Sequence, residues 1–280
     1  MLFRSMKANV SRVLVIFPFE EELYRRAGVP VQFVGHPLVD LAREEQARPA
    51  FLRDLGLLPD APTVALLPGS RRNELQRIAP TMAAALPLIR ARVPDVQFVI
   101  AGAPGLPEHV FAPLFARDSG FGIQDSPGGV QRSGGSRIPS SESRLPVLVH
   151  GRTDDVIAAS DVVITASGTA TVQCALHERP MVVVYRLSSL DYQMGKRFVT
   201  NDTYAMPNLV AGHRIVPELI QDEFTPERVA EETVALLTDH GLHARTREAL
   251  GRVREQLGRS GASARAADAV LEVARGAKSN

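Results

Sequence analysis

Two short segments carry the residue types that could bind an anion. The first is Gly69-Ser70-Arg71, which follows the apolar run 63–67 and precedes a helical pattern. The second is Ser167-Gly168-Thr169, which follows the apolar run 162–165. A strand, a turn with Gly and Ser or Thr, and a helix present free backbone N–H groups at a helix N-terminus, where phosphate binds favourably. The pair predicts a ligand with a diphosphate, so a nucleotide is the leading hypothesis.

The side chains in and near these segments suggest individual roles. Gly69 permits close backbone approach or a positive φ, and Ser70 could cap the following helix or donate to a phosphate oxygen. Arg71 could neutralise a diphosphate with forked hydrogen bonds. Gln173 lies one turn beyond the second segment, where an amide could reach ribose or sugar hydroxyls. Each segment alone also fits an ordinary capped junction, with a surface Arg in the first and a Thr N-cap in the second.

The elements that must position these segments alternate between strands and helices. Several apolar runs are apolar throughout, as expected for strands covered on both faces. The alternation predicts an α/β fold: a Rossmann-like parallel sheet flanked by helices. In such a sheet both segments would lie at strand carboxyl ends, beside one crevice. Strands are predicted at residues 13–17, 31–34, 63–67, 96–101, 146–149, 162–165 and 181–185, and helices at 19–27, 74–92, 154–160, 169–177 and 190–199.

Composition divides the chain into four parts. Residues 1–37 hold only two predicted strands, and we interpret them as the remnant of an N-terminal βαβ domain. Residues 38–62 read as a linker with a polar helix, and residues 63–225 as the nucleotide-binding domain. Within that domain, residues 118–145 are rich in Gly, Ser, Arg and Pro and predict a disordered insertion. Residues 226–280 predict helices only, with breaks near 239–241 and 259–261.

Overall composition excludes several functional classes. The net charge of +1 over 280 residues gives no general field that favours nucleic acid. The single cysteine, Cys174, excludes an internal disulfide framework and fits a reducing compartment, so we expect a cytoplasmic protein. No apolar run approaches the roughly 20 residues that a membrane span needs. Residues 187–198 place apolar side chains on one helical face, which fits core packing or contact with an acyl chain or membrane surface.

Other catalytic and metal-binding patterns are missing from the sequence. It contains no Gly-x-Ser-x-Gly elbow, Walker loop, His-Glu-x-x-His or Cys-x-x-Cys. The histidines show no metal spacing, so we expect neither a metal nor another cofactor. His36 and His150 follow predicted strands and are candidates for the same crevice. Cys174 lies inside an apolar helical pattern, which fits a buried structural thiol.

A series of motifs, weak one by one and specific in their order, resembles the lipid-A-disaccharide synthase family. The resemblance covers nearly the whole chain except residues 118–145. The motifs are Phe33-Val34-Gly35-His36-Pro37, Leu67-Pro68-Gly69-Ser70-Arg71, Ala166-Ser167-Gly168-Thr169-Ala170, Pro180 to Arg186, Pro207-Asn208 to Gly212, and Val216 to Gln221.

The resemblance implies a glycosyltransferase of the GT-B type, with two Rossmann-like domains and the active site between them. The family transfers 2,3-diacylglucosamine from UDP-2,3-diacylglucosamine to the lipid acceptor 2,3-diacylglucosamine 1-phosphate in lipid A biosynthesis. UDP is released, and no metal is required. The resemblance is compatible with a homodimer and with peripheral contact with the cytoplasmic face of the inner membrane. By resemblance, the diphosphate would meet Gly69, Ser70, Arg71, Ser167, Gly168 and Thr169, and Asn208, Glu218 and Gln221 would line the donor side of the cleft.

The sequence departs from the family pattern in three respects. The Gly-rich opening of the family's first domain is absent, so we expect most of the acceptor-side domain, to which the general base is attributed, to be missing. Gln173 stands where the family usually has a Glu that binds ribose hydroxyls, which removes a charge-assisted hydrogen bond. The insertion at 118–145 is atypical.

These departures leave more than one function open. We expect UDP binding, with Arg71 assisting departure of the diphosphate, but little or no transferase turnover by this chain alone. A non-catalytic sugar-nucleotide-binding module and a different UDP-sugar enzyme of the same architecture remain alternatives.

Overall fold

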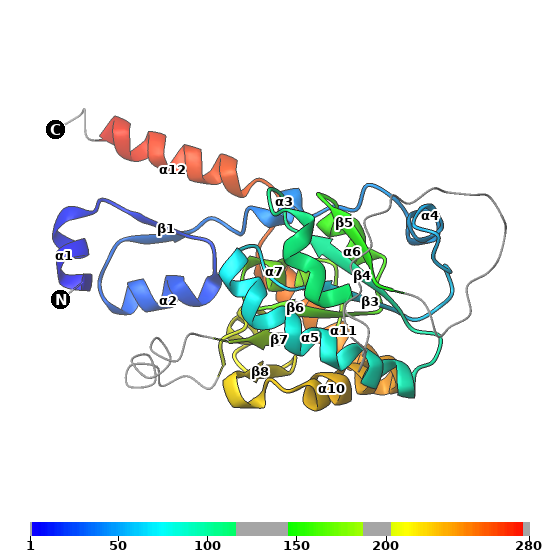
Figure 1. Cartoon of the computed structure of the whole chain (residues 1–280). Coiled ribbons are helices and arrows are strands. Elements are labelled where there is room, and N and C mark those ends of the chain that lie inside the picture. The colour runs from blue at the N-terminus through cyan, green and yellow to red at the C-terminus, as the bar shows by residue number, and fades with distance from the viewer. Residues whose placement is uncertain (1, 116–144, 187–202, 277–280) are drawn as a thin grey trace.

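The central feature of the fold is a six-stranded parallel sheet with the strand order β5-β4-β3-β6-β7-β8. The computed structural model describes residues 2–115, 145–186 and 203–276. Figure 1 shows helices on both faces of the sheet. The strands are β3 (Thr63–Leu67), β4 (Gln97–Gly102), β5 (Val147–His150), β6 (Val162–Ala166), β7 (Met181–Tyr185) and β8 (Glu218–Ile220).

The strand order sets where a ligand can bind. The chain builds outward from β3 through β4 to β5, then returns to the other side of β3 with β6 and continues to β8. Val64 pairs with Val162 and Leu67 with Thr165, so β3 and β6 are parallel neighbours whose carboxyl ends lie side by side. The order of strand addition reverses between these two strands, and ligands of open α/β sheets bind at such a switch point.

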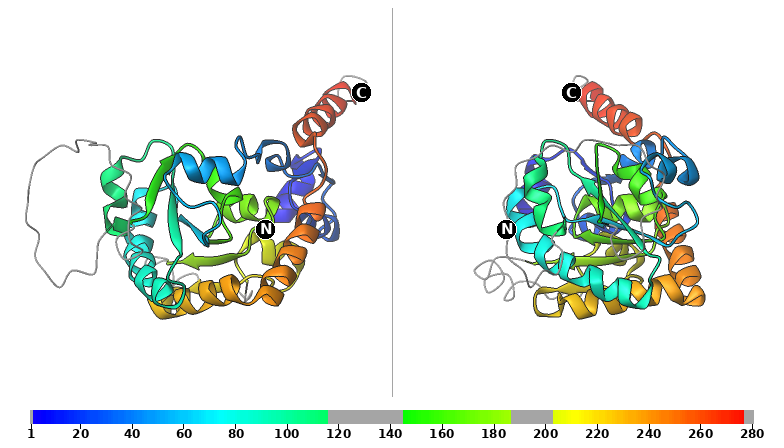
Figure 2. Two further views of the ribbon diagram at one scale, coloured as in Figure 1. Left: turned by 90° about the vertical axis from the view of Figure 1, so that its right-hand side faces the viewer. Right: turned by 45° about the vertical axis from the view of Figure 1, so that its right-hand side comes forward.

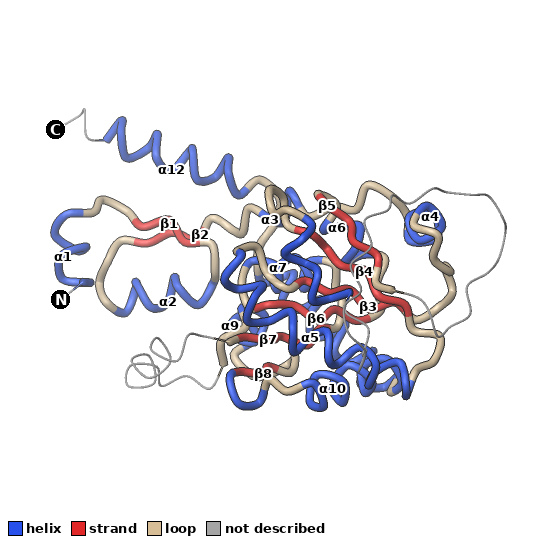
Figure 3. The backbone as a smooth tube through the Cα atoms, viewed as in Figure 1, coloured by secondary structure: helices blue, strands red, loops and turns tan. Residues whose placement is uncertain are grey.

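Alternating side chains of β3 supply a core on each face of the sheet, because successive residues of a strand point to opposite faces. Val64 and Leu66 pack into one core with the helices α5 and α10, and Ala65 and Leu67 pack into the other. The central strands β3, β4 and β6 are therefore buried on both faces, as their apolar sequences predict. Figures 2 and 3 show this layered arrangement from several sides. The flanking helices are α4 (Arg48–Asp54), α5 (Arg72–Arg92), α6 (Thr153–Ala158), α7 (Thr169–Leu176), α9 (Met206–Ala211), α10 (Pro226–Thr238) and α11 (His240–Gln256), with 3-10 helices at Glu108–Phe115 and Gln221–Glu223.

A small N-terminal unit lies beside this domain. It consists of α1 (Leu2–Asn9), β1 (Val13–Val15), α2 (Pro18–Arg26) and β2 (Val31–Phe33), and its two strands are parallel. The short helix α3 (Leu38–Leu41) leads from it toward the large sheet.

The C-terminal helix α12 (Ala262–Gly276) runs alongside the N-terminal unit (Figure 1). Arg265 Nε donates to the Val34 carbonyl at 2.9 Å, and Arg12 pairs with Glu272 at 2.7 Å. The two ends of the chain are therefore joined by polar contacts.

The predicted α/β fold with a parallel sheet and C-terminal helices is confirmed. Strand β8 was not predicted from the sequence, and the polar helix expected within residues 38–62 is α4, which begins at Arg48. Phe51 and Leu52 of α4 are fully buried, so the segment interpreted as a linker contributes to the core. The predicted insertion 118–145 and the predicted helix 190–199 lie almost entirely outside the described residues. The division into domains remains a prediction.

Candidate functional site at the strand switch point

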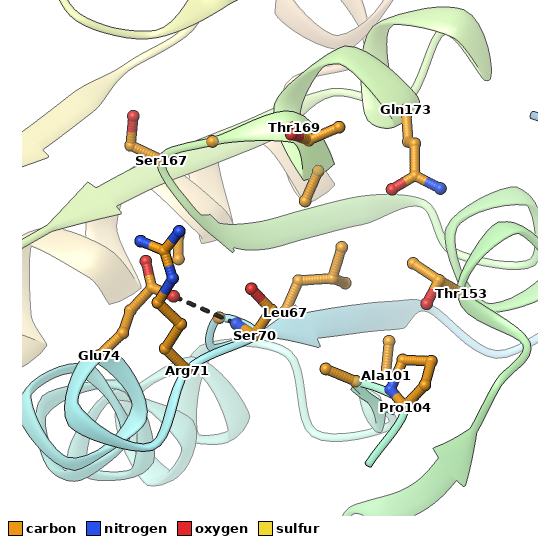
Figure 4. A pocket seen from close by; sticks show the side chains of 15 residues that line it. Leu67, Ser70, Arg71, Glu74, Ala101, Pro104, Thr153, Ser167, Thr169 and Gln173 are labelled. Carbon is orange, nitrogen blue, oxygen red and sulfur yellow. Dashed lines mark hydrogen bonds between the residues drawn. The ribbon is translucent and has the colours of Figure 1, made fainter. Parts of the chain in front are cut away.

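A pocket of about 340 Å³ opens at the carboxyl ends of β3 and β6 (Figure 4). Its walls come from the junctions that follow β3, β4 and β6 and from the first turns of α5, α6 and α7. Its volume falls in the range of small-molecule sites. The pocket contains seven residues predicted from the sequence: Gly69, Ser70, Arg71, Ser167, Gly168, Thr169 and Gln173.

The junction after β3 leaves the N-cap of α5 without a side-chain cap. Gly69 has a φ of 118°, which explains why this turn needs glycine. Arg71 is the N-cap residue in an extended conformation, and no side chain caps the helix. The expectation that Ser70 caps α5 is therefore wrong, because the helix begins one residue later than the cap would require. The free N–H groups and the positive end of this helix favour an anion.

The junction after β6 also leads into a helix without a side-chain cap. Gly168, with a φ of 150°, is the N-cap of α7, and no side chain caps this helix either. Thr169 is the first helical residue, so the alternative of a Thr N-cap is wrong too. Both helix N-termini border one pocket, which places two sets of unsatisfied amide donors around the same space.

Arg71 supplies the cation of the pocket. Its side chain is exposed and makes no hydrogen bond or ion pair with any residue that the structure describes. Figure 4 shows Arg71 and Glu74 at one end of the pocket and Gln173 at the other. A guanidinium without a partner retains all its donors for a ligand.

Glu74, in the first turn of α5, is a pocket residue that the sequence analysis missed. Its carboxylate accepts a hydrogen bond from the backbone N–H of Ser70 at 3.1 Å. A Glu three residues after a helix N-cap typically accepts from the N–H of the N-cap residue, and here it accepts instead from Ser70, the residue before the N-cap Arg71. The spacing of Glu74 from Arg71 indicates a carboxylate at this turn.

Gln173 belongs to a polar group at the far end of the pocket. Its amide nitrogen lies 3.4 Å from both carboxylate oxygens of Asp154. Asp154 also contacts His177 Nε2 at 2.9 Å, and His177 Nδ1 lies 3.7 Å from Glu44. The amide nitrogen therefore faces Asp154, which leaves the carbonyl oxygen of Gln173 as the group able to accept from a ligand hydroxyl.

Asn208, Glu218 and Gln221 do not line this pocket. Asn208 and Glu218 are buried, and the Asn208 amide donates to Glu218 Oε1 at 2.5 Å. Glu218 Oε2 also accepts from the backbone N–H of Tyr204 at 2.8 Å. In this structure the two side chains connect the start of β8 with α9. Their assignment to the donor side of the cleft remains a prediction.

The remaining residues singled out from the sequence lie elsewhere. His36 is buried, and burial lowers the pKa of its imidazole. His150 stacks edge-on against Phe111 and does not line the pocket. Cys174 is fully buried, as predicted, and burial raises the pKa of its thiol, which fits a structural thiol.

Two further properties of the described residues concern metals and membranes. No group of three or more His, Cys, Asp or Glu side chains in this part of the chain could hold a metal ion. None of the described helices has the length and apolar character to cross a membrane.

Comparisons with known proteins agree with the sequence motifs. The profile of the family described as lipid-A-disaccharide synthetase matches residues 3–117 and 141–273. The lipid-A-disaccharide synthase of Geobacter sulfurreducens is 40% identical over 264 residues, covering 94% of this chain and 62% of the relative. That of Myxococcus xanthus is 38% identical over 270 residues, covering 96% and 64%. The chain therefore spans a little under two thirds of the length of these relatives.

Solved structures support the fold. UDP-GlcNAc 2-epimerase from Neisseria meningitidis, bound to UDP-GlcNAc, has a TM-score of 0.59 at 12% identity, covering 92% of this chain and 61% of the epimerase. Anabaena HepE in complex with UDP has a TM-score of 0.52 at 12% identity, covering 98% and 66%. At such low identity the likeness is one of architecture alone. The family profile and the relatives near 40% identity decide the assignment: this chain belongs to the lipid-A-disaccharide synthase family.

Proposed function

We propose that the pocket binds the diphosphate of a UDP-sugar, as the donor site of a lipid-A-disaccharide synthase. The observation that carries this proposal is the meeting of two helix N-termini that lack a side-chain cap with the guanidinium of Arg71, which has no partner among the described residues. Each helix terminus favours an anion by about 0.3–1 kcal/mol. A hydrogen bond to a charged group adds about 1.5–3 kcal/mol. Arg71 is therefore the dominant contact, and Gly69, Ser70, Ser167, Gly168 and Thr169 complete the cradle.

The family relationship supports a particular donor and acceptor. We propose transfer of 2,3-diacylglucosamine from UDP-2,3-diacylglucosamine to 2,3-diacylglucosamine 1-phosphate. The acceptor hydroxyl attacks the anomeric carbon, the bond from that carbon to the diphosphate breaks, and a base takes the hydroxyl proton. UDP leaves with additional negative charge. Arg71 and the helix amides stabilise the departing diphosphate most when this charge develops, which is where binding lowers the barrier.

The acceptor suggests where such a protein works. A monosaccharide that carries acyl chains resides in a membrane, so we propose peripheral contact with the cytoplasmic face of the inner membrane. A homodimer also remains a prediction.

Titration calorimetry with UDP tests the site. Replacing Arg71 with Ala removes the charge-assisted hydrogen bonds, and we expect UDP affinity to fall about 10- to 100-fold. Arg77→Ala is the matched control, because Arg77 is exposed on the same helix and does not line the pocket. Its UDP affinity should equal that of the unchanged chain. Equal affinity of Arg71→Ala and the unchanged chain, or no UDP binding by either, would contradict the proposal.

A further inference from the structure

The carboxylate of Glu74 lies on the turn where a phosphate would bind. Its Oε2 accepts from the Ser70 N–H at 3.1 Å (Figure 4). A Cβ placed on Gly69 would lie 2.3 Å from the same oxygen, so the carboxylate packs directly against the glycine backbone. The Glu74 carboxylate therefore fills the space that the missing side chain of Gly69 leaves at this turn.

The position of this carboxylate resembles that of a bound phosphate oxygen. Both groups are anions that accept from backbone N–H groups at the start of a helix. Glu74 and a diphosphate would share the Ser70 amide and the positive end of α5, and two anions at this spacing repel each other. A ligand that binds the turn must displace the carboxylate or bind weakly beside it.

We propose that Glu74 is an internal competitor that occupies the phosphate position until the nucleotide displaces it, and so weakens the affinity for diphosphate ligands. This inference rests on the proposed function. If the site is open in only a fraction of the molecules, the apparent dissociation constant increases by the inverse of that fraction. Arg71 and the second helix N-terminus, that of α7, supply the attraction that the displacement requires.

A purely structural role for Glu74 makes a different prediction. If the carboxylate only caps the first turn of α5, its loss would destabilise the protein or disorder the turn, and UDP would bind no better. Glu74→Gln separates the two roles, because its amide oxygen can still accept from the Ser70 N–H while the charge is gone. Glu74→Asp keeps the charge on a side chain that is one methylene shorter and draws it away from the turn.

The experiment measures UDP and uridine binding by calorimetry to the unchanged chain, Glu74→Gln and Glu74→Asp. We expect Glu74→Gln to bind UDP about five- to tenfold more tightly and Glu74→Asp to show a smaller gain in the same direction. Uridine, which has no phosphate, should bind all three equally. Glu227→Gln is the control, because it makes the same charge change at an exposed position in the first turn of α10.

The outcomes distinguish this inference from the proposed function. If the unchanged chain binds UDP but both Glu74 variants bind it equally or more weakly, Glu74 is not a competitor and the donor site stands. A gain in Glu227→Gln as large as that in Glu74→Gln also overturns the inference, since general charge would then explain it. No UDP binding by the unchanged chain overturns both proposals.

Discussion

Gly168 holds an unusual conformation at the edge of the proposed diphosphate site. Its φ of 150° and ψ of −158° are rarely adopted by residues with a side chain. Among the described residues, its two chain neighbours aside, no heavy atom would lie within 4 Å of an added Cβ. A substitution here would therefore act through backbone strain rather than through a clash, and the strain would fall on the turn that directs the N-terminus of α7 into the pocket.

We expect Gly168→Ala to reduce both stability and nucleotide binding. Strain of this kind costs about 1–3 kcal/mol, which urea unfolding can measure. The turn can relieve the strain only by reorienting its amides, so UDP affinity should also fall. Gly251→Ala is the control, because Gly251 lies inside α11 without a positive φ. Unchanged stability and affinity in Gly168→Ala would show that the turn conformation is not required.

At the residue scale the sequence predicted seven of the residues that line the pocket but did not single out Glu74. Gly69, Ser70 and Arg71 are recognisable because turn chemistry and charge are local properties. The contact of Glu74 with the Ser70 amide depends on a side-chain rotamer, which the sequence does not specify. Asn208 and Glu218 were singled out from the order of the motifs. That order could not show that the two side chains form a hydrogen bond with each other.

At the scale of elements, the position of the pocket follows from strand order. The sequence predicted most strands because each is a continuous apolar run. Strand β8 was not predicted, because its three residues include the charged Glu218 and so do not form a continuous apolar run. The order β5-β4-β3-β6-β7-β8 has no local signal. That both junctions share one crevice was expected only from the general rule for parallel sheets.

Asp155 connects elements near the pocket. It lies in α6, two residues after the pocket residue Thr153, and its side chain is 3% exposed. Its Oδ1 accepts from the backbone N–H groups of Glu45 and Gln46 at 2.8 and 2.9 Å, and its Oδ2 accepts from Arg152 Nε at 2.9 Å. The carboxylate thereby anchors the segment before α4 to the sheet domain.

We expect Asp155→Ala to destabilise the protein by about 2–4 kcal/mol, because two backbone amides and a guanidinium lose a buried acceptor. Urea unfolding measures this change. Asp268→Ala, at an exposed position of α12, should change stability by less than about 0.5 kcal/mol. A loss below about 1 kcal/mol in Asp155→Ala would indicate that water replaces the carboxylate and that the anchor is weak.

At the scale of the whole molecule, contacts between distant parts of the chain complete the fold. The His36 N–H donates to the Leu257 carbonyl at 2.8 Å, which joins the N-terminal unit to the end of α11. Asp40 accepts from the Gly261 N–H at 2.9 Å, and this hydrogen bond is the main reason that the pKa of its carboxyl group is lowered. The sequence predicted the N-terminal unit and the C-terminal helices separately. It could not predict that they meet, because a contact between residues this far apart leaves no periodic pattern.

Hydrogen–deuterium exchange with and without UDP tests the central claim most directly, because it reports on both helix N-termini in one experiment. We predict that UDP slows exchange of the backbone amides at the starts of α5 and α7 together, while uridine slows neither and α11 is unaffected by both ligands. Slowing at only one of the two helix starts, or equal slowing by uridine, would contradict a diphosphate held between them.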